Sequence, residues 1–212
     1  MRSPLAERER DRLIEAVLPD VPFDGWTDTA LRGAARRIDM PPDEAVALFP
    51  GGGPDLVAEF SRWADRRMLD RLETLPPETD RVSARIRHAV LTRFDIVAPW
   101  REAVRHALSV LAVPPHAVLG ARLLYETVDG IWYAVGDTAT DFSFYTKRAT
   151  LAGIYSATLL YWLEDRSDGF ADTEAFLDRR LDELRRLTRA RQRLDSTLAR
   201  LPNPFRLLRP VR

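Results

Sequence analysis

The 212-residue sequence contains no cysteine and no long apolar run. Without cysteine the chain forms no disulfide and no thiolate metal site, and it has no cysteine nucleophile. No stretch reaches the roughly 18 consecutive apolar residues that a membrane-spanning helix requires. The first residues are charged and lack the apolar core of a secretory signal, so we expect a cytoplasmic protein.

Motifs of common catalytic sites are missing as well. There is no Gly-x-Ser-x-Gly sequence, and the glycines at 51–53 lead to Pro54 rather than to the Gly-Lys-Ser/Thr of a phosphate-binding loop. A di-iron site in a helical bundle needs Glu-x-x-His pairs, and none occurs. Glu102 and His106 are four residues apart, but one such pair is more often a solvated helix face. The sequence therefore predicts no catalytic residue, no metal site and no cofactor.

Charge is balanced over the whole chain but unevenly distributed. Thirty-two basic residues offset thirty-two acidic ones. Residues 177–212 hold 11 arginines against 4 acidic residues, a difference of +7, so residues 1–176 carry −7. The chain therefore ends in a basic segment attached to an acidic body.

Hydrophobic spacing is helical nearly throughout, and the chain is predicted to be all-α. Three short helices before a larger helical body are typical of the TetR-like fold, in which a helix-turn-helix module precedes a ligand-binding, dimerising bundle. The expected units are a degenerate helix-turn-helix module at 1–54, a helical body at 55–186 and a basic amphipathic segment at 187–212. The predicted helices cover residues 5–18, 29–38, 42–49, 55–75, 80–98, 100–111, 115–135, 143–163 and 172–201.

The helix at 42–49 decides between two functions for such a fold. A ligand-responsive TetR-type transcriptional regulator, which is the alternative hypothesis, would read bases there with basic or amide side chains. This helix instead has Asp43 and Glu44 in its first turn, which would repel DNA phosphates. Arg32, Arg36 and Arg37 on the preceding helix could touch the DNA backbone but could not read its sequence. We therefore predict a retained module that binds no nucleic acid.

The C-terminal helix combines a leucine stripe with an arginine-rich surface. Up to residue 186 acidic and basic residues are mixed, which favours docking of the leucine stripe onto the core or onto a second subunit. From residue 187 the arginine excess is nearly uncompensated, as in helices that lie at an anionic membrane surface. We therefore expect peripheral membrane association. The predicted membrane contacts are Leu187, Arg189, Arg193, Leu194, Leu198, Leu201, Phe205, Leu207 and Leu208.

Residues 129–169 are unusually rich in aromatic side chains beside charged ones. Phe144 and Tyr145 are neighbours, and adjacent side chains on a helix point about 100° apart, so at least one is expected at the surface. The segments Trp132-Tyr-Ala-Val-Gly-Asp-Thr-Ala-Thr-Asp-Phe-Ser-Phe-Tyr-Thr-Lys-Arg-Ala and Leu151-Ala-Gly-Ile-Tyr-Ser, followed by the block at 168–180, resemble ubiquinone (coenzyme Q) biosynthesis accessory proteins of TetR-like fold. The resemblance is strong over residues 125–185.

The resemblance implies a specific function. Members of this family are non-catalytic homodimers that bind an isoprenoid lipid or quinone precursor in the helical body. They present it from a membrane surface to a di-iron quinone hydroxylase. The resemblance leaves the residues that line the lipid cavity unassigned. Where the family usually has tryptophan, this chain has Phe144, which keeps the apolar side chain but loses an indole hydrogen bond. The family's partner-binding surface corresponds to Asp129, Ile131, Phe144, Tyr145 and Arg148.

Overall fold

The computed structural model describes the chain at residues 4–74, 81–136 and 142–198, and its side chains at 7–74, 81–136 and 145–186. Every regular element in these ranges is helical, which confirms the predicted all-α class. Short 3-10 turns, η1 (Ala98–Trp100), η2 (Pro114–His116) and η3 (Asp168–Phe170), join some of the helices. The α-helices are α1 (Pro4–Val17), α2 (Val21–Asp24), α3 (Asp28–Arg37), α4 (Pro42–Ala47), α5 (Gly53–Thr74), α6 (Val82–Val97), α7 (Arg101–Leu111), α8 (Ala117–Ala134), α9 (Phe142–Glu164) and α10 (Ala171–Leu198).

The helix ends follow local sequence signals with one exception. Thr27 caps α3, because its hydroxyl oxygen accepts a hydrogen bond from the backbone N–H of Ala30 at 3.3 Å. The exception is α2, which the sequence did not predict because Pro22 reads as a helix stop. Pro22 occupies the second position of α2, where its missing N–H costs no helical hydrogen bond.

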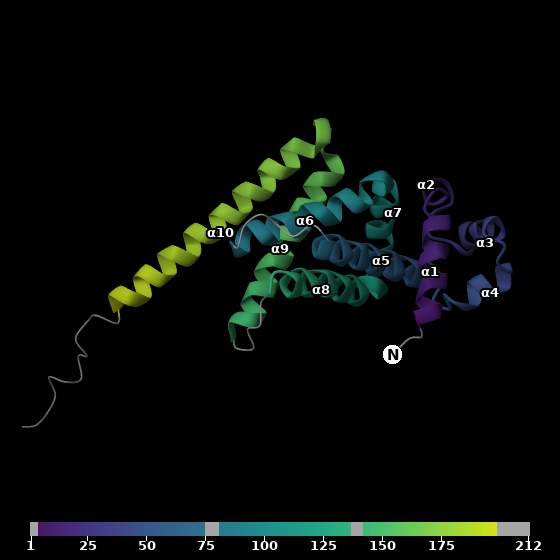
Figure 1. Cartoon of the computed structure of the whole chain (residues 1–212), viewed down its shortest axis with the longest axis horizontal. Helices are drawn as coiled ribbons and strands as arrows, with labels where there is room; N and C mark the ends of the chain where they lie inside the picture. Colours follow the sequence, from purple (N-terminus) through teal and green to yellow (C-terminus); the bar gives the residue numbers. More distant parts are fainter. Residues whose placement is uncertain (1–3, 75–80, 137–141, 199–212) are drawn as a thin grey trace, which may run out of the picture.

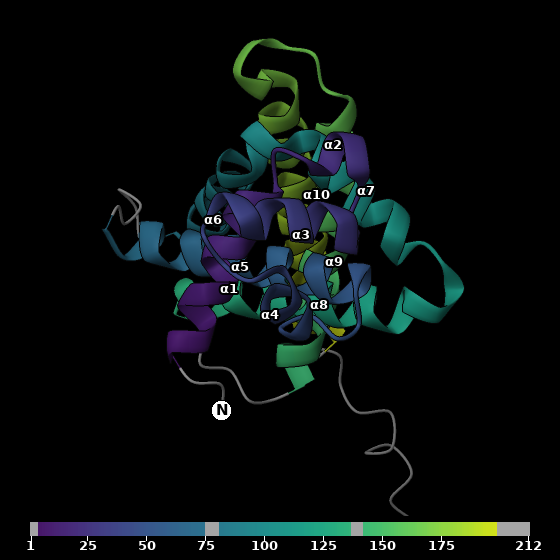
Figure 2. The same cartoon turned by 90° about the vertical axis from the view of Figure 1, so that its right-hand side faces the viewer.

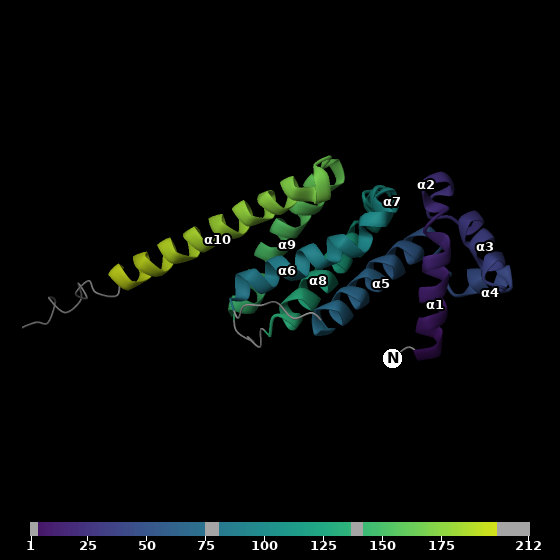
Figure 3. The ribbon, with the colours of Figure 1, turned by 45° about the horizontal axis from the view of Figure 1, so that its top comes forward.

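Helices α1 to α4 form a module at one end of the molecule (Figures 1 and 3). The turned view places this module in front of α5 to α9 (Figure 2). Trp26 fixes it to the body, because its indole N–H donates to the carbonyl of Ala103 in α7 at 3.1 Å and its ring lies 5.1 Å from that of Phe60 in α5. Gly53 makes this contact possible, since a Cβ there would lie 2.4 Å from the Trp26 carbonyl oxygen.

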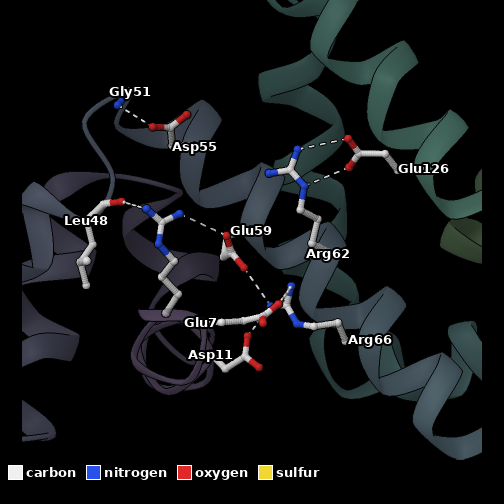
Figure 4. A network of polar contacts seen from close by, with 10 residues as sticks. Glu7, Asp11, Leu48, Gly51, Asp55, Glu59, Arg62, Arg66 and Glu126 are labelled. Atoms are coloured by element: carbon white, nitrogen blue, oxygen red, sulfur yellow. Dashed lines mark hydrogen bonds and ion pairs between the residues drawn. The ribbon is translucent and has the colours of Figure 1, made fainter. Parts of the chain in front are cut away.

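A network of ion pairs holds α1 against α5 (Figure 4). Glu59 of α5 is 2% exposed and lies between two arginines: Arg66 donates to it at 2.8 Å and Arg10 of α1 at 3.3 Å. Arg66 also pairs with Asp11 and, at 3.3 Å, with Glu7, both on α1. The module and the body therefore share a polar contact as well as an apolar core.

Helices α5, α6 and α8 lie side by side, α9 packs on α8, and α10 packs on α9 and α6. Trp162, near the end of α9, is fully buried, with its ring stacked 5.5 Å from that of Phe94 in α6. Asp165 organises the turn into α10 by accepting hydrogen bonds from the backbone N–H groups of Ser167 and Thr173, each at 2.8 Å. Burial would raise the pKa of Asp165, but hydrogen bonds from the Ser167 and Thr173 hydroxyls, together with these backbone bonds, outweigh it and lower that pKa to about 2.

Among the described residues, no single helix is long and apolar enough to cross a bilayer. One pair, Val82–Leu111 with Pro114–Ala134, passes that test jointly by length and composition, with a bend of 100° between its two parts.

Candidate functional site

A cavity of about 340 Å³ lies between α5, α6, α7, α8 and α9. Pockets for small molecules are usually about 300 to 1,000 Å³, so this one has room for a modest ligand. Its wall is mostly aliphatic and aromatic, and each of the five helices contributes to it. The lining side chains are Val57, Phe60, Ser61, Arg93, Val104, Ala107, Leu108, Leu111, Ala112, Leu123, Leu124, Thr127, Tyr155, Ser156 and Leu159, with Gly120.

The inner wall of the cavity is polar and buried. Arg93 of α6 is 7% exposed, and its guanidinium donates to Asp65 at 2.7 Å, to the Tyr155 hydroxyl at 2.7 Å, and to the hydroxyl and carbonyl of Ser61 at 3.2 and 3.4 Å. Thr127 completes the cluster by donating to the Asp65 carboxylate at 3.0 Å. We call these five residues the polar wall; four of them line the cavity, and Asp65 lies behind them.

Protonation in the polar wall is fixed by burial and charge. Burial would lower the pKa of Arg93, but Tyr155 and Asp65 outweigh it and raise that pKa, so the guanidinium stays charged. Burial raises the pKa of Tyr155 to about 12, so its phenol stays neutral. The polar wall thus combines one ion pair with neutral hydroxyl groups.

The opposite end of the cavity is apolar and more accessible. Leu108, Leu111 and Gly120 are half-buried, and Ala112 is exposed where α7 ends. Thr127 and Tyr155 are 2% and 3% exposed, respectively. The cavity therefore has an apolar mouth near the α7–α8 connection and a polar interior.

The structure brings some of the predicted partner-binding residues close together. Asp129 on α8 and Arg148 on α9 form an ion pair of 2.7 Å, and Tyr145 near the start of α9 is 68% exposed. Phe144 belongs to α9, but its side chain lies outside the described ones. Ile131 does not lie at this surface, because its side chain is fully buried three residues after Val128 on α8, and Arg148 is itself only 6% exposed.

Comparison with solved structures gives a likeness of fold. A TetR transcriptional regulator from Nitrosomonas europaea superposes with a TM-score of 0.67 and 23% sequence identity, over 83% of this chain and 97% of that one. This likeness confirms the predicted TetR-like fold.

Comparison of sequences gives the family. The COQ9 family description matches residues 117–188. The ubiquinone biosynthesis protein COQ9-B, mitochondrial, of Xenopus laevis is 33% identical over 198 residues, which is 90% of this chain and 67% of that protein. The chain belongs to the COQ9 family. The mitochondrial COQ9 proteins of rat and human are 32% and 31% identical, and the chain spans about three fifths of their lengths (63% and 62%).

In this COQ9-family chain the first half of α10 docks as the sequence predicted. Leu177 and Leu181 are buried against the body, and Arg87 of α6 pairs with Asp178 at 2.7 Å and with Glu174 at 2.8 Å. The second half continues as a helix to Leu198 and extends past the body (Figures 1 and 3).

The predicted membrane contacts cannot be placed as side chains. One group has a described backbone in α10 but no described side chains, and it comprises Leu187, Arg189, Arg193, Leu194 and Leu198. The other group lies outside the described residues and comprises Leu201, Phe205, Leu207 and Leu208.

Arginines of the helix-turn-helix module form ion pairs within the module. Arg32 pairs with Asp43 of α4 at 2.7 Å, and Arg37 pairs with Asp20 at 2.6 Å. Two of the three arginines that could meet a DNA backbone are therefore paired with carboxylates of the same module. Within the described residues, no group of three or more histidine, aspartate or glutamate side chains could hold a metal ion.

The polar wall is the part of the site that sequence reasoning missed. Its members come from positions 61, 65, 93, 127 and 155, and no short motif contains two contacting groups. One signal was present: Arg93 falls at helical spacing with Ile86, Val90 and Val97, on the buried stripe of α6 where an apolar residue is expected.

Proposed function

We propose that this protein acts in ubiquinone biosynthesis as a non-catalytic accessory protein. It binds an isoprenoid lipid or quinone precursor in the α5–α9 cavity, as a homodimer at a membrane surface, and presents it to a di-iron hydroxylase. The observation that carries the proposal is a ligand-sized, mostly apolar cavity in a chain whose relatives are named ubiquinone biosynthesis proteins. An isoprenoid chain suits the aliphatic mouth formed by α7 and α8.

The same fold occurs in a transcriptional regulator, but the surface chemistry of the module favours the accessory role. The first turn of α4 carries Asp43 and Glu44, and the side chain of Asp43 is 92% exposed. DNA binding draws most of its affinity from basic groups that neutralise phosphates. An acidic α4 beside arginines that are paired within the module offers little of that affinity.

Native mass spectrometry of the purified protein, followed by lipid extraction, tests the proposal directly. We expect a dimer with about one isoprenoid quinone or quinone precursor per subunit. Exposed apolar side chains on α8 and α9, such as Val118 and Leu160 at 82% and 60% exposure, support association between subunits. A protein that carries no lipid, and takes up none when mixed with vesicles containing ubiquinone, would contradict the carrier role.

The partner surface is proposed to be the exposed start of α9 beside the Asp129–Arg148 pair. Replacing Tyr145 by lysine should weaken binding to the hydroxylase about tenfold or more, because a large exposed aromatic contact is replaced by a strongly hydrated cation. Phe23→Lys is the matched control, since Phe23 is 88% exposed but lies in the distant module. Surface plasmon resonance should show the loss for Tyr145→Lys alone. Equal affinities for both variants would place the partner elsewhere.

Membrane contact is proposed for the basic second half of α10. Reversing charge at Arg189 and Arg193 should reduce co-sedimentation with anionic vesicles about tenfold or more, since each basic residue near such a surface is worth about 1 kcal/mol. The same reversal at Arg179 and Arg186, in the docked half, changes net charge equally. If both pairs of substitutions reduce binding to the same extent, net charge and not the second half of α10 governs the contact.

A further inference from the structure

We propose that the hydroxyl groups of Tyr155 and Ser61 donate hydrogen bonds to a neutral oxygen on the ring of a prenylated ligand. The ligand would enter the cavity ring first, with its isoprenoid chain leaving past the apolar mouth. This inference rests on the proposed function and assigns the ligand's orientation and the residues that recognise its ring.

The two hydroxyl groups are oriented by Arg93. Each accepts a hydrogen bond from the guanidinium, Tyr155 at 2.7 Å and Ser61 at 3.2 Å. A hydroxyl group that accepts from a cation keeps its own proton for donation and donates more strongly. Within the described residues, neither hydroxyl group donates a hydrogen bond to a protein acceptor, and both residues line the cavity. An oxygen on a ligand could accept hydrogen bonds from both hydroxyl groups.

The charge of the polar wall selects a neutral acceptor. Asp65 contacts Arg93 at 2.7 Å, so the ion pair contributes no net charge. Burying an anionic carboxylate or phosphate beside it would place a second negative charge near Asp65 without a new cation. A carbonyl, hydroxyl or ether oxygen carries no such penalty. These are the oxygens of quinone and phenol rings.

The position of the polar wall sets the direction of entry. Tyr155 is 3% exposed and Arg93 is 7% exposed, whereas Leu108 and Leu111 at the mouth are half-buried and Ala112 is exposed. An amphiphile that entered chain first would leave its ring oxygens at an apolar mouth and the hydroxyl groups without acceptors. Ring-first entry brings the ring oxygens to the hydroxyl groups and leaves the isoprenoid chain at the apolar mouth. At about 340 Å³ the cavity suits a substituted ring with a short part of its chain.

The test compares Tyr155→Phe with Tyr161→Phe, its matched control. Tyr161 lies on the same helix, stacks on Phe176 and does not line this cavity. The probes are a short-chain ubiquinone with two isoprene units and farnesene, an isoprenoid hydrocarbon without oxygen. Tyr155→Phe should weaken binding of the ubiquinone about tenfold, the effect of one lost hydrogen bond, and leave farnesene affinity unchanged. Tyr161→Phe should change neither.

Infrared spectroscopy of the ubiquinone labelled with ¹³C at its carbonyls gives a second readout. Bound to the unaltered protein, a carbonyl band should lie below its position in hexane, and Tyr155→Phe should move it back toward that position. Ser61→Ala provides an independent variant if Tyr155→Phe does not fold. Equal weakening for both probes, or no weakening for either in Tyr155→Phe and Ser61→Ala, would overturn the inference alone. An unaltered protein that binds neither probe would overturn the proposed function as well.

Discussion

Replacing Arg93 by leucine should lower the free energy of unfolding by about 3 to 5 kcal/mol, because the partners it leaves are buried. Asp65 would keep a negative charge on a side chain that is 14% exposed, without its cation. Tyr155 and Ser61 would lose the donor that holds them. Urea denaturation followed by circular dichroism measures the change. Arg122→Leu, at an exposed position of α8, removes the same group and should cost less than about 0.5 kcal/mol.

A second substitution separates the cost of losing the Arg93 contacts from the cost of leaving the Asp65 charge without a partner. In Arg93→Leu with Asp65→Asn no unpaired charge remains, and Thr127 keeps an oxygen to which it can donate. We expect the double variant to recover at least half of the stability lost in Arg93→Leu, since much of the cost of breaking a buried pair comes from the partner left behind. A loss below about 1 kcal/mol in Arg93→Leu would mean that the pair is not coupled in solution.

Much of the fold could be predicted from the helix-breaking and helix-capping residues in the sequence. Proline, glycine and capping residues divide the helical pattern into segments whose ends lie near the observed ones, as Thr27 does for α3. The short helix α2 was missed because a proline is tolerated in the first turn of a helix, so Pro22 reads equally well as a stop. Its stability comes from the surrounding core, in which Val21 is fully buried, and sequence spacing alone does not reveal that.

The site was less predictable than the fold for a physical reason. Helical periodicity identifies a buried stripe, but it does not say which polar residues from different helices meet. Ser61, Arg93 and Tyr155 come together only through the packing of α5, α6 and α9. The difference at Ile131 has the same origin. The family resemblance assigns Ile131 to the partner surface, whereas its position on α8 directs its side chain into the core.

Replacing Glu59 by glutamine should lower the free energy of unfolding by about 2 to 3 kcal/mol, because it removes the carboxylate that joins Arg10 to Arg66. The cost is below that of Arg93→Leu because both arginines keep other partners: Arg10 donates to the Leu48 carbonyl at 2.6 Å and Arg66 pairs with Asp11. Glu73→Gln, at an exposed position of the same helix, should change stability by less than about 0.5 kcal/mol.

The effect of Glu59→Gln should depend on pH. Burial would raise the pKa of Glu59, but hydrogen bonds from Arg66 and Arg10 outweigh it and hold that pKa below the ordinary value of 4.5. A carboxylate whose pKa is lowered in the folded state stabilises the protein above its unfolded pKa, and this contribution is lost as pH falls through the folded pKa. The stability difference between the unaltered protein and the variant should therefore shrink below pH 4.5. Denaturation at pH 7 and at acidic pH measures it.

The network also bears on how the helix-turn-helix module is used. A regulator that releases DNA on ligand binding needs its module to move relative to the body, whereas Glu59, Arg10 and Arg66 hold α1 to α5 across a buried contact. In Glu59→Gln we expect amide hydrogen exchange to rise more in α1 than in α9, because the module loses an attachment in addition to the loss of overall stability. Faster exchange in both helices to the same extent would instead mean that module and body unfold as one unit, and that this contact stabilises the whole fold.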